Sequence, residues 1–146
     1  MVTIGIAMLQ GARHAHIDAI QRAASEMSFD IEIVELRTIE DLQQQPIDGL
    51  MLPGGESTVM RLRGNDEASR LLPALFEWMR EDESRPVLAT CAGAILLANP
   101  QDGGDALVDA DIDRNAYGSQ VDSFESALDC GFPGIFIRAP RFGEVR

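Results

Sequence analysis

The stretch from Arg85 to Ala98 limits the fold of this chain more than any other part of the sequence. The apolar run Val87–Ala89 is followed at once by Thr90 and Cys91, and then by small and apolar residues typical of a buried helix. The run predicts a strand covered on both faces, and the change of pattern predicts a sharp turn from strand to helix. A strand that leads directly into a helix is the repeating unit of parallel α/β sheets.

Cys91 lies on this predicted turn and is followed by the small residues Ala92, Gly93 and Ala94. A nucleophile on a strand-to-helix elbow needs small neighbours, because the turn is tight and a substrate must reach the sulfur. The free N–H groups at the start of a helix favour a thiolate and can hold an oxyanion. The alternative is an inert free cysteine in a core turn. The other cysteine is Cys130, and we do not expect the two to form a disulfide.

The rest of the sequence alternates strand and helix patterns. We expect strands at 3–9, 30–36 and 48–52, helices at 12–27 and 38–45, and a helical region with an apolar stripe at 71–79 before the elbow strand. This order predicts one domain over residues 1–146, with a mostly parallel central sheet and helices on both faces. Beyond Ala98 we expect a polar loop at 99–113 and strands at 120–128 and 134–137.

The carboxyl ends of parallel strands are where such sheets bind ligands. Three predicted loops meet there: Gln10–Gly11, Gly54–Thr58 and Cys91–Gly93. The two glycines of the middle loop let backbone N–H groups face a ligand, so this loop and the Ala92 N–H could together form an oxyanion hole. The alternative is a glycine-rich turn in which Ser57 caps the next helix.

The charge balance excludes several classes of function. The chain carries 12 basic residues, all arginine, against 24 acidic ones, for a net charge of −12. We therefore expect no nucleic-acid or membrane partner. An acid-rich chain without lysine also predicts a salt-adapted, halophilic source. The sequence shows no membrane span and no signal peptide, which favours the cytoplasm. It also shows no spacing typical of zinc or EF-hand sites, so we expect neither metal nor cofactor.

Four further residues are candidates for the site. His14 and His16 are the only histidines, and either could serve Cys91 as a base or lie on the surface of a helix. Arg114 and Arg138 could bind a carboxylate through their planar guanidinium groups, or form structural ion pairs in this acidic chain.

Together these segments resemble the glutaminase subunit of pyridoxal 5′-phosphate synthase, a branch of the class I (triad) glutamine amidotransferases. The matching pieces follow the family's order and cover almost the whole chain: Leu9–Ala12 with His16 and Ile17, Leu52–Thr58, Thr90–Gly93, Arg114–Gly118, Gln120–Glu125, and Phe136–Pro140. The resemblance implies a flavodoxin-like three-layer fold and the hydrolysis of L-glutamine to glutamate and ammonia. It also implies that the ammonia passes to a barrel-shaped synthase subunit. The activity expected overall is therefore that of a hydrolase and a lyase.

The resemblance implies a role for each matching residue. Cys91 would attack the glutamine amide, and the backbone N–H groups of Gly55 and Ala92 would hold the oxyanion. The residues expected to position glutamine are Gly55, Glu56, Ser57, Arg114, Ile137 and Arg138. The Gln10–Gly11 loop would lie near the oxyanion site and the partner.

The sequence departs from the family in one respect. The family takes its base and the acid that orients it from a His-Pro-Glu motif near the C-terminus, and this sequence has no histidine after His16. We expect a truncated chain with little or no turnover of its own, and apolar surface exposed near Ile135 and Ile137. The competing interpretation is a degenerate domain that binds glutamine or the synthase subunit without turnover.

Overall fold

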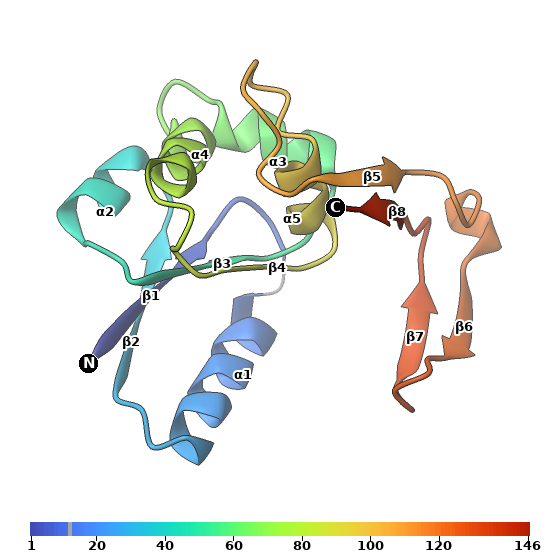
Figure 1. Ribbon diagram of the computed structural model, residues 1–146, viewed down its shortest axis with the longest axis horizontal. Helices are drawn as coiled ribbons and strands as arrows, with labels where there is room; N and C mark the ends of the chain where they lie inside the picture. The colour runs from blue at the N-terminus through green and yellow to red at the C-terminus, as the bar shows by residue number, and fades with distance from the viewer. Residues whose placement is uncertain (12) are drawn as a thin grey trace. The chain divides into compact units, whose positions relative to one another are not determined.

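The computed structural model describes residues 1–11 and 13–146. These form two compact units, Met1–Leu107 and Val108–Arg146, which are described separately (Figure 1). The single-domain assignment therefore stays a prediction.

A four-stranded parallel sheet forms the centre of the first unit, in the strand order β2-β1-β3-β4. Its strands are β1 (Val2–Ala7), β2 (Ile31–Leu36), β3 (Gly49–Leu52) and β4 (Val87–Ala89). The four residues of β3 are all buried, as expected for a central strand covered on both faces. The predicted parallel α/β sheet is confirmed.

In the described part of this unit five helices accompany the sheet, and Figure 1 shows α1 on one face and α2, α4 and α5 on the other. Their bounds are α1 (Arg13–Glu26), α2 (Ile39–Gln44), α3 (Ser57–Gly64), α4 (Leu71–Glu81) and α5 (Ala92–Ala98). The predicted apolar stripe of α4 is buried in the core, through Leu71, Leu72, Leu75, Phe76 and Met79. Helices on both faces are thus confirmed, while the predicted first residue of α1, Ala12, lies outside the described residues.

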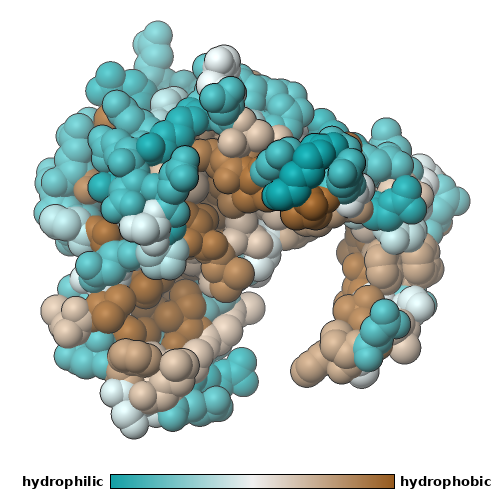
Figure 2. All heavy atoms as spheres, viewed as in Figure 1, coloured by the Kyte–Doolittle hydropathy of each residue, from teal (hydrophilic) through white to brown (hydrophobic). Residues whose placement is uncertain are grey.

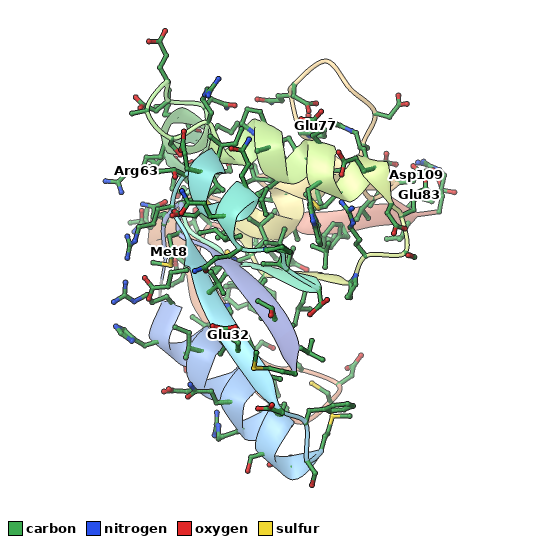
Figure 3. The ribbon with its side chains drawn as sticks, turned by 90° about the vertical axis from the view of Figure 1, so that its left-hand side faces the viewer. Met8, Glu32, Arg63, Glu77, Glu83 and Asp109 are labelled. Atoms are coloured by element: carbon green, nitrogen blue, oxygen red, sulfur yellow. The ribbon has the colours of Figure 1, made fainter. Side chains whose placement is uncertain are left out.

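The edge strand β2 follows the alternation that its sequence predicts only in its first half. Glu32 is exposed between the half-buried Ile31 and Ile33 (Figure 3). Val34 and Leu36 lie on the same face as Glu32 but are buried, so this face passes from solvent into the core along the strand. The helix that follows begins with a capping box. The Asp41 N–H donates to Thr38 Oγ1 at 3.4 Å, and the Thr38 N–H donates to Asp41 Oδ2 at 3.0 Å.

The prediction that β4 is covered on both faces is wrong. Leu88 is 60% exposed, because β4 is an edge strand of this sheet. On the face that carries α1, the described residues include no second helix to cover β4 (Figure 1). Apolar residues reach the surface there (Figure 2) and line an open groove of about 240 Å³. Its lining is Ile4, Ile20, Gly49, Leu50, Met51, Pro86, Val87 and Leu88.

The second unit contains two antiparallel strand pairs. β5 (Ala110–Asp113) pairs with β8 (Arg141–Val145), and β6 (Phe124–Ala127) pairs with β7 (Pro133–Phe136). The loop predicted at 99–113 therefore ends in a strand, because β8, distant in sequence, supplies the pairing. Arg146 supports this pair through ion pairs to Asp109, Asp111 and Glu144 at 3.0–3.1 Å.

Only part of the strand predicted at 120–128 forms. Residues Gln120–Asp122 make a short 3-10 helix, because Ser119 and Asp122 form a capping box that folds the chain before β6. The apolar exposure predicted nearby is confirmed, since Ile135 is 65% and Ile137 is 59% exposed. Within the described part of the chain, no helix has the length and apolar character needed to cross a membrane.

An ion pair joins α4 to the loop after α5 and should make stability depend on pH. Arg80 donates to the Asp102 carboxylate at 2.6 and 3.1 Å and to the Asp105 carbonyl at 2.7 Å. The hydrogen bonds from Arg80 to the Asp102 carboxylate hold the pKa of Asp102 below its ordinary value. The stabilisation is therefore present above the unfolded-state pKa of about 3.9 and is lost as pH falls through the lower folded-state pKa.

We expect Asp102→Asn to lower the free energy of unfolding by about 0.5 kcal/mol at pH 7, and this difference to disappear in strong acid. Urea titrations of both proteins at several pH values measure it. Asp105→Asn is the comparison, with a smaller expected loss, since Arg80 hydrogen-bonds the backbone carbonyl of that residue and its carboxylate acts on Arg80 through charge alone. A difference that stays constant from neutral to acid pH would contradict the assignment to this ion pair.

Candidate active site

The three loops predicted to meet at the carboxyl ends of the strands do meet in the first unit. The Glu56 N–H donates to Gln10 Oε1 at 2.7 Å, which joins the first loop to the second. A β-carbon added at Gly54 would lie 2.6 Å from Cβ of Cys91, which shows how closely the second loop approaches the third. The prediction that these loops meet is confirmed, and ligand binding at this edge stays a prediction.

Cys91 occupies a strained elbow between β4 and α5. Its backbone angles are φ 50° and ψ −120°, a combination that residues other than glycine rarely adopt. The turn is held at Thr90, whose N–H donates to the Leu52 carbonyl at 3.1 Å and whose carbonyl accepts from the Gly93 N–H at 2.9 Å. Cys91 is exposed and free, so the core-cysteine alternative is wrong, and Cys130 is exposed and free as well.

A close approach of backbone segments fixes the start of α5. Gly93 lies against the end of β3, where an added β-carbon would be 2.3 Å from the Leu52 carbonyl oxygen. Ala92, the first residue of the helix, is buried. An N–H at this helical position has no acceptor within its own helix, so it is free to serve as an oxyanion donor.

The glycine-rich loop ends in a helix cap that differs from the predicted one. Glu56 caps α3, since its Oε2 accepts from the Val59 N–H at 2.9 Å. Ser57 is instead the first residue of the helix and is 3% exposed. The alternative that Ser57 caps the helix is wrong, because the longer Glu56 side chain reaches the amide that a cap must satisfy. The expected contacts of Glu56 and Ser57 with glutamine stay predictions.

The two histidines differ in their surroundings. His16, in the first turns of α1, has Nε2 at 3.0 Å from Oγ1 of Thr90, the residue before Cys91. His14 is exposed. The pair His16–Thr90 spans 74 positions of sequence, and no local pattern could have indicated it. The prediction that one of these histidines is the base for Cys91 stays a prediction.

The remaining predicted substrate residues belong to the second unit. Arg114 follows β5, and Ile137 and Arg138 follow β7. Arg138 has a positive φ of 44°, which marks a constrained turn in a residue that is not a glycine. Because the two units are described separately, the grouping of these three residues with Cys91 stays a prediction.

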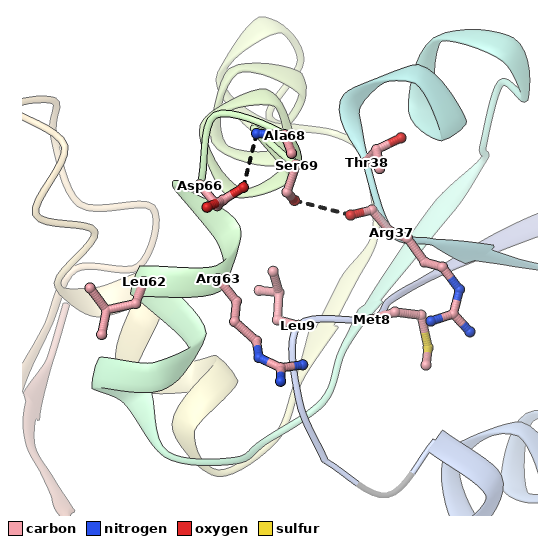
Figure 4. Close-up of a pocket in the computed structure, with 9 residues that line it drawn as sticks. All are labelled: Met8, Leu9, Arg37, Thr38, Leu62, Arg63, Asp66, Ala68 and Ser69. Atoms are coloured by element: carbon pink, nitrogen blue, oxygen red, sulfur yellow. Dashed lines mark hydrogen bonds between the residues drawn. The ribbon is translucent and has the colours of Figure 1, made fainter.

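A separate pocket lies where β1 and β2 end. It has a volume of about 480 Å³, and Figure 4 shows Arg37 and Arg63 on either side of Met8. None of the predicted site residues lines it. Among the residues that the structure describes, no group of three or more His, Cys, Asp or Glu side chains gathers to hold a metal ion.

Comparison with known proteins agrees with this geometry. Residues 6–146 match the SNO glutamine amidotransferase family. A pyridoxal 5′-phosphate synthase subunit PdxT from Thermococcus onnurineus is 41% identical over 99% of this chain and 76% of its own length. The PdxT subunits of Methanothermobacter thermautotrophicus and Haemophilus ducreyi are 40% and 41% identical, over 99% and 98% of this chain and 74% and 72% of theirs.

These matches correct two expectations. The lyase class is wrong, because the family is described as glutamine amidotransferases, and release of ammonia from an amide by water is hydrolase chemistry. The expectation of a halophilic source is not upheld either, since nothing in the family or in these relatives supports it. The predicted family itself is confirmed. The chain belongs to the SNO glutamine amidotransferase family.

Proposed function

We propose that this chain is the glutaminase subunit of a pyridoxal 5′-phosphate synthase, and that Cys91 is its nucleophile. Residues 1–146 would act as one amidotransferase domain. The observation that carries the proposal is the exposed thiol of Cys91 on a strained elbow, packed directly against the glycine-rich loop. The family membership supports the same reaction.

The proposed reaction has two halves. The sulfur of Cys91 attacks the side-chain amide carbon of L-glutamine, the thiol proton passes to the amide nitrogen, the carbon–nitrogen bond breaks to release ammonia, and a thioester remains. Water then attacks the thioester, the carbon–sulfur bond breaks to release glutamate, and a proton of that water restores the thiol. Both halves pass through an oxyanion, and the backbone N–H groups of Gly55 and Ala92 are the proposed donors.

Glutamine would be held at both of its ends. Gly55 and Glu56, in the loop beside Cys91, and Ser57, at the start of α3, are the proposed contacts near the reacting amide. Arg114 and Arg138 are the proposed partners of the substrate carboxylate, because a guanidinium group donates two parallel hydrogen bonds to a carboxylate. Ile137 would contribute a backbone contact.

The proposed partner is a synthase subunit that consumes the ammonia. The relatives are named as subunits of pyridoxal 5′-phosphate synthase, which supports an assembly of this kind. The Gln10–Gly11 loop lies beside the glycine-rich loop and is exposed, so it is the proposed edge of the contact with the partner, a barrel-shaped subunit. Ammonia released at Cys91 would pass to that subunit without entering bulk solvent.

Alkylation by a diazoketone analogue of L-glutamine tests the proposal directly, because the reaction requires both binding of the analogue and nucleophilic attack by the thiol. The thiol sulfur displaces dinitrogen from the analogue and forms a thioether, while the thiol proton goes to the diazo carbon. We expect intact-mass and peptide analysis to find one modification, at Cys91, and excess L-glutamine to slow it. The reaction is run on the full chain, alone and with the synthase subunit.

The second cysteine supplies the matched control. Cys91→Ala should remain unmodified, whereas Cys130→Ser should be modified at the rate of the unchanged chain. Equal modification of both cysteines, or a rate that L-glutamine does not change, would contradict a glutamine site at Cys91.

A further inference from the structure

We infer that His16 is a positioning residue for Cys91, which acts through the hydroxyl of Thr90 to hold the nucleophile's turn. The inference rests on the proposed function, since it concerns the attack by Cys91 on a glutamine-like substrate. It starts from the distance of 3.0 Å between His16 Nε2 and Thr90 Oγ1, a contact between α1 and the turn at the end of β4.

Thr90 connects the sheet to the elbow that carries Cys91. Its N–H is bound to the end of β3, through the Leu52 carbonyl, and its own carbonyl is bound to Gly93 in α5. These two bonds hold the backbone of Thr90. The third contact, to His16, holds its side chain, and a β-branched side chain with a fixed χ1 further restricts the backbone beside it.

The residue after Thr90 is the one that needs this restraint. Cys91 has a φ of 50°, in a region where a β-carbon is crowded by the backbone. Such a conformation persists only when its surroundings over-determine it. Loss of one restraint on Thr90 should let the turn relax toward an ordinary conformation, which moves the thiol away from its position beside Gly54.

The place of His16 suits this role. Both His16 and Thr90 are half-buried, so water competes less for their hydrogen bond than it would on an open surface. His16 lies on α1, a helix of 14 residues, so its contact with Thr90 fixes the turn against a rigid element. The contact connects the helix on one face of the sheet with the strand end that carries the nucleophile.

Alkylation by the diazoketone analogue separates positioning from binding, because its rate saturates with concentration. We expect Thr90→Val and His16→Ala each to lower the maximal rate of Cys91 modification about tenfold and to leave the half-saturating concentration within about twofold. Thr90→Ser and His16→Gln, which keep a polar atom near the same place, should recover most of the rate. The double variant His16→Ala/Thr90→Val should be no slower than either single variant, because both remove the same contact.

Gln21→Ala, an exposed change on the same helix, is the control and should keep the rate of the unchanged chain. Thermal unfolding of every variant shows which of them fold. If Thr90→Val or His16→Ala does not fold, the rates of Thr90→Ser and His16→Gln are compared with that of the unchanged chain instead. Maximal rates within twofold for Thr90→Val and His16→Ala, or additive losses in the double variant, would overturn the inference while the proposed function stands. Absence of any modification in the unchanged chain would overturn both.

Discussion

Gly93→Ala is expected to lower the free energy of unfolding by about 3 kcal/mol. The added β-carbon would lie 2.3 Å from the Leu52 carbonyl oxygen and 3.1 Å from the Pro53 carbonyl oxygen. Both are backbone atoms of β3 and its end, and they cannot move aside as a flexible side chain can. The start of α5 must therefore shift away from the sheet, and the bond from the Gly93 N–H to the Thr90 carbonyl must be strained or broken.

A urea titration measures this loss, and Gly143→Ala is the matched control. Gly143 lies in the exposed strand β8, where an added β-carbon would meet Cβ of Asp111 at 3.2 Å. That contact is with a side chain at the surface, so we expect a change within about 0.5 kcal/mol. A loss at Gly93 no larger than the loss at Gly143 would show that α5 does not pack on the end of β3 as described.

Much of the first unit could be predicted because its elements are specified by local patterns. The apolar stripe of α4 follows the helical period, and the Thr38–Asp41 capping box is encoded within four residues. The strand-to-helix change at Cys91 is likewise local. The alternation of such elements is enough to imply a parallel sheet, and the sheet brings the three loops together.

The features that sequence reasoning missed depend on contacts between distant residues. β5 forms because β8 pairs with it, and nothing in the acidic sequence around Asp111 indicates that partner. The apolar run of β4 does not show whether both faces of its strand are covered, and Leu88 is exposed. The His16–Thr90 contact also joins segments far apart in the chain. In each case the local residues determine the character of the segment, whereas its structure depends on a contact with a segment distant in sequence.

Gly54→Ala should reduce the reactivity of Cys91 far more than it reduces stability. An added β-carbon would lie 2.6 Å from Cβ and 3.3 Å from Sγ of Cys91, and 3.1 Å from the Thr90 carbonyl oxygen. The thiol must move, and the strained backbone of Cys91 leaves it little room to do so. We expect the rate of modification by the diazoketone analogue to fall about 100-fold, because displacement of a reacting atom by about 1 Å is enough for such a loss.

Stability should change by only about 1–2 kcal/mol, since Gly54 is half-buried and the loop can yield at the surface. Gly49→Ala is the matched control in the strand that precedes this loop. Its added β-carbon would first meet the side chains of Ile4 and Pro86, at 3.2 and 3.4 Å, and not the nucleophile. We expect Cys91 in that variant to react at the rate of the unchanged chain. A Gly54→Ala chain that also kept this rate would mean that the glycine-rich loop does not set the position of the thiol, and the proposed oxyanion site between Gly55 and Ala92 would lose its geometric basis.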